Sequence, residues 1–150
     1  MAAYCLKPTQ IFASNEAEDI LFKSVKRIKG EAPVTLRILH PQGSLENIRP
    51  CATSFTKKSG IEFEFIETPV DNINTKIFID HARGKNTFDI ALPATFAIPD
   101  LAESGSLAEL TEYSNEYEQE CSYPPSLYDL GDSFNGKFYG YQTDGDIYMM

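Results

Sequence analysis

The sequence predicts an α/β fold in which a mostly parallel sheet is flanked by helices. Two observations support this. Three segments with strand character, at residues 34–39, 61–66 and 88–92, are separated by two segments with helical character. Strands that alternate with helices of this length form βαβ units with right-handed crossovers. The 150 residues are also enough for one domain with a core of its own.

An irregular segment and a helix are expected before the first strand. Residues 1–13 show no periodic pattern. Ser14 or Asn15 can cap a helix that Gly30 ends, and its apolar side chains recur every three or four residues, at Leu21, Val25 and Ile28. We therefore divide the chain into an irregular N-terminal segment, 1–13, and one folded lobe, 14–150.

The first strand and the helix after it are defined by their breaks. Residues 34–39 are β-branched and mostly apolar, as in a largely buried strand. Residues 40–44 are predicted to form a loop. Pro50 is predicted at the first position of the next helix, because a proline inside a helix costs about 3 kcal/mol. Gly60 marks the end of that helix.

The second βα unit follows the same logic. Residues 61–66 alternate between apolar and acidic side chains, which predicts a half-exposed strand. Asp71 can cap the following helix, and Gly84 closes it. The third strand, 88–92, is short and apolar, and Pro93 ends it.

The pattern is looser after the third strand. We expect a short helix over residues 98–103 and a second, rich in carboxylates, over 114–120. Asn135-Gly136 predicts a tight hairpin, because both residues tolerate positive φ. The final run, 146–150, resembles a strand that is cut short.

Charge and cysteine content exclude several classes of partner. The 13 basic and 22 acidic residues give a net charge of −9, so phosphate backbones and anionic lipids should repel the chain. We predict no nucleic-acid partner. The three cysteines, Cys5, Cys51 and Cys121, lack metal-ligand spacing and are interpreted as unlinked small hydrophobic residues, although a Cys51–Cys121 bridge is conceivable. No cofactor and no metal site is predicted.

No segment has the roughly 20 apolar residues of a membrane-spanning helix. The N-terminus lacks the apolar middle of a secretory signal. From these residues alone the chain would be assigned to the cytosol.

Ligands of open parallel sheets bind beyond the carboxyl ends of the strands. Two loops meet that condition, 40–44 and 93–97. The first loop offers an imidazole, an amide and a hydroxyl group for ligand contacts. The alternative interpretation of this loop is an ordinary polar turn. Near the C-terminus, Asp144 and Asp146 can accept hydrogen bonds from sugar hydroxyls, perform acid–base chemistry, or lie in a solvated turn.

Several other side chains have simpler interpretations. His81 lacks a metal-ligand neighbour and is expected on a helix surface. A late group of aromatic residues can stack on sugar rings but is more often part of a core; it comprises Phe138, Tyr139, Tyr141 and Tyr148. No strong catalytic constellation is present.

Four stretches, in this order, resemble one known family: residues 34–39, 55–65, 87–90 followed by 98–110, and 135–146. The chain is similar to the N-terminal lobe of extracellular solute-binding proteins of family 1, the sugar-binding components of ABC importers. The resemblance spans residues ~17–150 and implies a periplasmic-binding-protein-like lobe that closes on its ligand by hinge bending. It also implies that the chain is truncated before the second lobe.

The resemblance implies a non-catalytic function, namely binding of a small polar ligand of the carbohydrate class for import. The membrane subunits of an ABC transporter would be its partners, and its location would be periplasmic or extracellular. The ligand contacts carried over from the family are His40, Gln42, Pro93, Thr95, Asp144 and Asp146. Two alternatives remain open: an α/β enzyme that acts on a sugar through Asp144 and Asp146, and an inactive truncated fragment.

Overall fold

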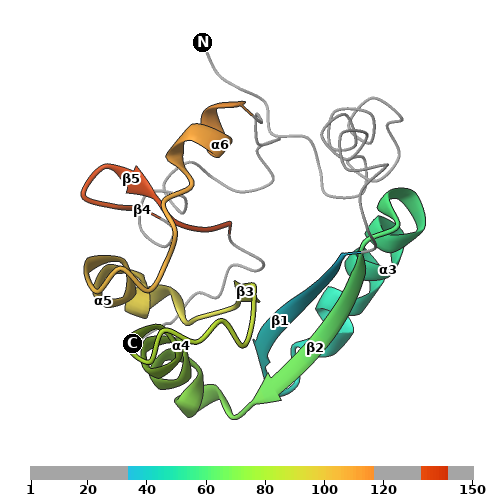
Figure 1. Ribbon diagram of the computed structural model, residues 1–150, viewed down its shortest axis with the longest axis horizontal. Coiled ribbons are helices and arrows are strands. Elements are labelled where there is room, and N and C mark those ends of the chain that lie inside the picture. The colour runs from blue at the N-terminus through green and yellow to red at the C-terminus, as the bar shows by residue number, and fades with distance from the viewer. Residues whose placement is uncertain (1–33, 117–132, 142–150) are drawn as a thin grey trace, which may run out of the picture.

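The computed structural model describes residues 34–116 and 133–141 (Figure 1). Four groups of expectations lie outside these residues. They are the irregular segment 1–13 with the helix after it, the cysteines Cys5 and Cys121, the carboxylates Asp144 and Asp146, and the final run 146–150 with Tyr148.

The described part of the chain contains a three-stranded parallel sheet, as predicted. Its strands are β1 (Thr35–Pro41), β2 (Glu62–Thr68) and β3 (Ile90–Ala91), in the order β2-β1-β3. Seven residue pairs join β1 to β2, and two join β1 to β3. Because β1 lies between the other two, the two helical connections of this sheet lead in opposite directions.

β1 extends two residues beyond the prediction. His40 and Pro41, expected in a loop, continue the parallel pairing and lie opposite Glu67 and Thr68. The reason is the length of β2, whose last carbonyl still accepts a hydrogen bond from Gln42 N at 2.9 Å. A proline at the last position of a strand loses little, because the pairing ends there.

The helix α3 (Leu45–Ser59) contains Pro50 in its sixth position, so the prediction that Pro50 begins the helix is wrong. The helix begins one turn earlier, where Asn47 N and Ile48 N donate to Ser44 O. Pro50 removes the donor that would reach Glu46 O. Both residues are exposed, so water can satisfy that carbonyl group. Gly60, with φ 77°, ends the helix as predicted.

The second crossover begins with a short 3₁₀ turn, η2 (Val70–Asn72), and continues as α4 (Ile73–Ala82). Asp71 is therefore not the cap; that position belongs to Asn72, which makes no side-chain cap bond. β3 is shorter than the predicted 88–92. Its flanking residues nevertheless extend the ladder, because Asp89 N donates to Arg37 O and Leu92 N donates to Leu39 O.

The remaining elements agree largely with the prediction. The turn η3 (Thr95–Ala97) leads into α5 (Ile98–Glu103), at the predicted position. α6 (Thr111–Glu116) begins three residues before the expected helix. The hairpin of β4 (Ser133–Phe134) and β5 (Lys137–Phe138) is confirmed, with φ of 52° at Asn135 and 73° at Gly136.

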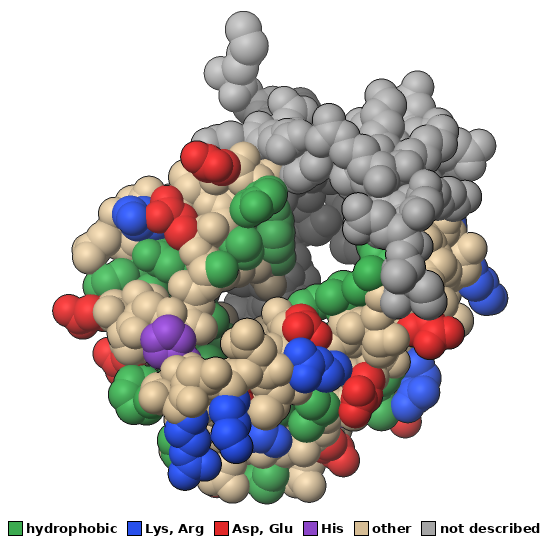
Figure 2. Space-filling model, viewed as in Figure 1, with side chains coloured by type: hydrophobic (Ala, Val, Ile, Leu, Met, Phe, Trp, Pro, Cys, Tyr) green, Lys and Arg blue, Asp and Glu red, His purple; other side chains and the backbone are tan. Residues whose placement is uncertain are grey.

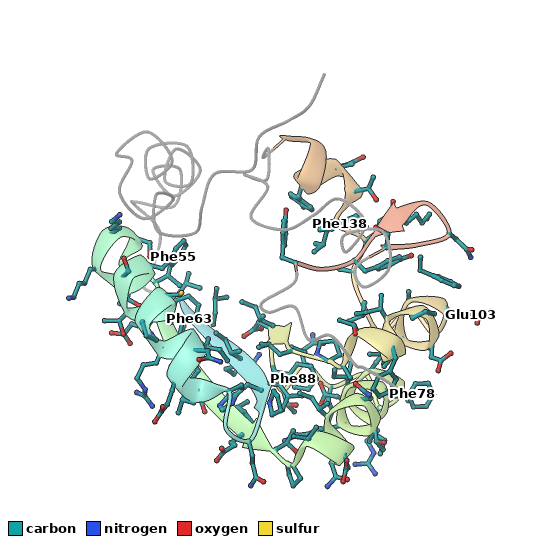
Figure 3. The ribbon with its side chains drawn as sticks, turned by 180° about the vertical axis from the view of Figure 1, so that it is seen from behind. Phe55, Phe63, Phe78, Phe88, Glu103 and Phe138 are labelled. Atoms are coloured by element: carbon teal, nitrogen blue, oxygen red, sulfur yellow. The ribbon has the colours of Figure 1, made fainter. Side chains whose placement is uncertain are left out.

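Helices cover both faces of the sheet, with α3 on one side and α4 and α5 on the other (Figure 1). The core on the second side consists of Leu39, Ile73, Ile77, Ala97 and Leu101. On the first side, Phe55 of α3 packs against Phe63 of β2, with ring centroids 5.9 Å apart. Figure 3 shows this pair on the opposite side of the strands from Phe88.

The surface agrees with an acidic, mixed-charge protein. On the face drawn in Figure 2, basic side chains gather at the lower left, and acidic and basic side chains alternate toward the lower right. Among the described helices, none has the length and apolar character that crossing a bilayer requires.

Candidate functional site

The sheet order creates a switch point at the carboxyl ends of β1 and β3. From β1 the chain passes to α3 on one face, and from β3 it passes to η3 and α5 on the other. Loops that diverge from adjacent parallel strands leave room for a ligand between them, which is the general binding position of open α/β sheets. This edge, formed by residues 42–44 and 92–97, is called the switch-point edge below.

The loop after β1 is a tight turn. Ser44 N donates to Pro41 O at 3.3 Å, and Gly43 at the third position has φ 86°. A type II turn requires this conformation at its third position, which explains the glycine. Gln42 N is anchored on Thr68 O, while its side chain is exposed. The turn therefore holds the Gln42 backbone and leaves its amide group available.

His40 has a different environment from the one its predicted role suggests. Only 1% of the residue is exposed. Its ring meets the edge of the Phe65 ring, with centroids 6.0 Å apart, on the α3 side of the sheet. Nδ1 lies 3.0 Å from Pro41 O and 3.2 Å from Ser44 Oγ. The imidazole is thus beneath the turn rather than on its outer surface.

The loop after β3 is fixed at two points. Leu92 N donates to Leu39 O at 3.0 Å, and Ala94 N donates to Asn74 Oδ1 of α4 at 3.3 Å. Pro93, which lies between the two anchored residues, is half-buried. Thr95, which follows the second one, is exposed. Because Leu39 belongs to β1, this loop lies directly beside the end of that strand.

The structure brings together the loops that carry four of the six predicted contact residues. Gln42, Pro93 and Thr95 lie at the switch-point edge, and His40 lies just below it. Asp144 and Asp146 lie outside the described residues. The hairpin that precedes them is docked on residues 109–111, where Leu110 N donates to Phe138 O at 2.7 Å.

Phe96 is a residue of this edge that sequence reasoning missed. It is 82% exposed, in the turn η3 next to Thr95. A large aromatic side chain so exposed provides a flat apolar face. A signal was present in the sequence, because Phe96 follows the strand-ending Pro93 within the loop where ligands were expected.

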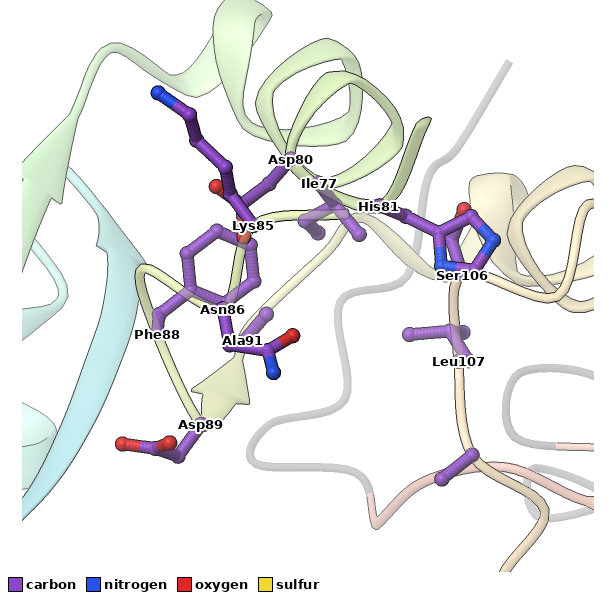
Figure 4. A pocket seen from close by; sticks show the side chains of 11 residues that line it. Ile77, Asp80, His81, Lys85, Asn86, Phe88, Asp89, Ala91, Ser106 and Leu107 are labelled. Atoms are coloured by element: carbon purple, nitrogen blue, oxygen red, sulfur yellow. The ribbon is translucent and has the colours of Figure 1, made fainter. Parts of the chain in front are cut away.

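Two surface pockets in the described part of the chain lie away from the switch-point edge. One, of about 240 Å³, is lined by the C-terminal end of α4, the segment from Lys85 to Ala91 and residues 106–108 (Figure 4). The other, of about 310 Å³, lies between α3 and β2. The switch-point edge is the candidate site, because ligands of open α/β sheets bind beyond the carboxyl ends of the strands.

Both carboxylates at the first pocket are engaged within the protein. Asp80 accepts hydrogen bonds from Thr87 N at 3.1 Å and from Thr87 Oγ1 at 2.6 Å. Burial raises the pKa of Asp80, but these hydrogen bonds outweigh it and the pKa is lowered. Asp89 is bound to Arg37, whose hydrogen bonds lower the pKa of Asp89. These acids fasten β3 to its neighbours, which is a structural role.

The chain is similar to known proteins in its three-dimensional structure. No family model matches the chain, and no curated protein matches it. Among solved structures, an ABC transporter solute-binding protein from Agrobacterium radiobacter K84 in complex with ribitol matches with a TM-score of 0.63 and 15% identity, over 71% of this chain and 29% of its own.

Two further structures match in the same way. The maltotriose-binding protein of Thermus thermophilus, bound with maltotriose, has a TM-score of 0.59 and 20% identity, over 70% of this chain and 28% of its own. The sugar-binding protein MalE from Xanthomonas citri has a TM-score of 0.63 and 18% identity, over 71% and 27%.

These matches confirm the expected fold. The chain has the α/β architecture found in part of the sugar-binding proteins of ABC transporters. It spans less than a third of the length of each of these structures.

Proposed function

We propose that this chain is a lobe of a solute-binding protein that binds a sugar or sugar alcohol for import by an ABC transporter, without catalysing a reaction. One observation carries the proposal. The sheet order places the Gln42 turn and the Pro93–Thr95 loop at a single switch-point edge, within a fold shared with sugar-binding proteins.

The chemistry of this edge suits a neutral polyol. The Gln42 amide can donate and accept hydrogen bonds, and so can the Thr95 hydroxyl group, which matches the mixed donor and acceptor character of sugar hydroxyls. The exposed ring of Phe96 offers the apolar face on which a sugar ring can stack. Pro93 restricts the backbone of the loop that carries Thr95 and Phe96.

Asp144 and Asp146 complete the proposed contact set. A carboxylate accepts hydrogen bonds from hydroxyl groups more strongly than a neutral acceptor does. The hairpin that precedes them is anchored on residues 109–111, so the two carboxylates follow a segment that is held in place. His40, also among the predicted contacts, is buried.

The partners and location follow from the proposed function. The membrane subunits of an ABC transporter would receive the loaded protein, and the location would be periplasmic or extracellular. The solved structures with this fold are solute-binding proteins, which favours binding over an enzyme that uses Asp144 and Asp146. A lobe that covers one side of a ligand should bind weakly, since binding pockets normally cover 70–90% of a ligand.

Amide chemical shifts during titration with maltotriose and with ribitol test the proposal, because they detect weak binding. We expect saturable shifts at Gln42, Gly43 and Thr95, and none at Lys85 beside the first pocket. Gln42→Ala and Thr95→Ala should weaken binding, whereas Lys85→Ala should not. Shifts confined to another surface, or none at the highest sugar concentration, would contradict the proposal. Sugar turnover that Asp146→Asn abolishes would favour the enzyme.

A further inference from the structure

The buried imidazole of His40 has two polar neighbours, and both contact the same ring nitrogen. Nδ1 lies 3.0 Å from Pro41 O and 3.2 Å from Ser44 Oγ. Ser44 Oγ in turn donates to Pro41 O at 2.9 Å. The three groups thus form a closed set beneath the turn that carries Gln42.

The donors in this set can be assigned by counting protons. Pro41 O is a carbonyl oxygen and only accepts. Ser44 has a single hydroxyl proton, and it is directed at Pro41 O, so toward His40 the Ser44 oxygen is an acceptor. Both neighbours of Nδ1 therefore accept, and Nδ1 must carry the proton. The neutral ring is then the Nδ1–H tautomer.

Pro41 O consequently receives three donors: Ser44 N at 3.3 Å, Ser44 Oγ at 2.9 Å and His40 Nδ1 at 3.0 Å. The hydrogen bond from the Ser44 amide closes the turn, and at 3.3 Å it is the longest of the three. The Ser44 hydroxyl group and the imidazole of His40 bind the same oxygen, and the imidazole does so from the buried side, since only 1% of His40 is exposed.

We propose that His40 is a positioning residue, which uses an Nδ1 proton to fix the turn that presents Gln42 to the ligand. This deepens the proposed function and rests on it for the role of Gln42. The tautomer and the control of the turn do not depend on any ligand. His40 thereby acts through the geometry of its neighbours and need not touch the sugar.

Two variants separate the Nδ1 donor from the bulk of the ring. In His40→Asn the side-chain amide nitrogen falls near the place of Nδ1, whereas in His40→Gln it falls near the place of Nε2. Both variants lose the contact of the ring with Phe65. A difference between them therefore reports the position of the donor and not the loss of packing.

Amide hydrogen exchange provides the readout at the turn. The amides of Gln42 and Ser44, bonded to Thr68 O and Pro41 O, are compared with that of Leu92, bonded to Leu39 O. The exchange rate of each turn amide is divided by that of the Leu92 amide, and this ratio removes changes in global stability. We expect this ratio to rise about fivefold in His40→Gln, as for one lost hydrogen bond, and to stay within about twofold of the original in His40→Asn.

The tautomer is measured separately by long-range ¹H–¹⁵N correlation of the histidine side chains. The sequence has two histidines, and His81 is exposed, so His81 serves as the reference for a ring in solvent. We expect His40 to show the pattern of the Nδ1–H form. An Nε2–H pattern, or equal exchange ratios in the two variants, would overturn the proposal.

The two proposals can fail independently. If maltotriose and ribitol do not bind but His40 is the Nδ1–H tautomer and the variants differ as expected, the proposed function fails while His40 still positions the turn. If the sugars bind and His40→Gln weakens their binding no more than His40→Asn does, the positioning role fails while the proposed function stands.

Discussion

Arg37 and Asp89 join the first and third strands of the sheet through three hydrogen bonds. Arg37 Nε and Nη2 donate to the carboxylate at 3.1 and 3.0 Å, and the Arg37 backbone amide donates to it at 2.9 Å. Only two residue pairs connect β1 with β3. Asp89, directly before β3, therefore supplies much of the attachment that positions the loop after this strand.

Asp89→Asn should weaken this attachment. The amide keeps the shape of the carboxylate but loses the charge, and one of its two polar atoms can no longer accept. Because both side chains are about one-third exposed, the ion pair itself contributes little. We expect the unfolding equilibrium constant to rise about fivefold, the effect of one lost hydrogen bond, in urea titrations at pH 7.

The matched control is Asp100→Asn, an exposed acid in the first turn of α5. Its substitution should change the urea midpoint less than Asp89→Asn does. Equal changes in the two variants would show that Asp89 acts only through the net charge of the protein.

The pH dependence of stability should include Asp89. In the folded state Arg37 lowers the pKa of Asp89 from its ordinary value of 3.8. The larger cause is the hydrogen bonding that the Arg37 side chain donates, and the second is the hydrogen bond from the Arg37 backbone amide. A carboxyl group of this kind stabilises the fold fully above its unfolded pKa, and the contribution is lost as pH falls through the folded pKa. We expect stability to decline below about pH 4.

The same decline should be shallower in Asp89→Asn. It should not vanish, because the pKa of Asp80 and of Glu109 is also lowered in the fold. Urea midpoints at pH 7, 5, 4 and 3 for both proteins give the comparison. An unchanged slope would mean that the Arg37–Asp89 contact is absent in solution.

The turn after β1 should depend on glycine at position 43. Gly43 has φ 86°, and a Cβ atom built on it meets nothing within 4 Å, so the cost of Gly43→Ala is a backbone cost alone. We expect a loss of about 1–2 kcal/mol in urea unfolding. Gly140→Ala is the control, since its Cβ is also unobstructed and its φ is not in the left-handed region. Equal losses would contradict a strained turn.

Asn74 should hold the loop after β3. Asn74→Ala removes the acceptor of Ala94 N, which lies between Pro93 and Thr95. We expect the Ala94 amide to exchange about fivefold faster relative to the Leu92 amide, since Leu92 keeps its bond to Leu39 O. Thr75→Ala, at an exposed neighbouring position of α4, should leave that ratio unchanged. A sugar-binding loss in Asn74→Ala without faster exchange would point to direct contact instead.

The sequence predicted the sheet because its signals are local. Two apolar runs, one alternating run and the glycines that end the helices between them suffice to indicate βαβ units, and Asn135-Gly136 indicated its own hairpin. Pro50 was misplaced because the penalty for an interior proline is smaller where water reaches the freed carbonyl group. That depends on which side of α3 faces the solvent, and the sequence does not show it.

The candidate site was less predictable, because it depends on distant contacts. In a run of apolar residues such as 34–39 the alternation does not reveal the faces, so the burial of His40 beneath α3 could not be foreseen. The Arg37–Asp89 contact joins residues 52 positions apart, and no local pattern indicates such a pair. Phe96 is a lone aromatic residue, and only its 82% exposure distinguishes it from a core residue.

The hairpin before residues 142–146 should depend on Lys137. Its ammonium group lies 2.7 Å from Glu109 Oε2, and its hydrogen bond lowers the pKa of Glu109. Glu109 also accepts from Thr111 Oγ1, which in turn accepts from Phe138 N at 3.1 Å. Lys137→Met should loosen this group, so we expect the Leu110 amide, bonded to Phe138 O, to exchange faster than in the original protein.

The effect of Lys137→Met should be local and sensitive to salt. Both charged groups are about half exposed, so we expect a small change in the urea midpoint and a clear one at the Leu110 amide. Added salt at 1 M should reduce the difference between the two proteins, since it screens an exposed ion pair. Lys57→Met, on the exposed side of α3, is the control. If both variants leave the Leu110 amide unchanged, the Lys137–Glu109 ion pair does not contribute to docking the hairpin.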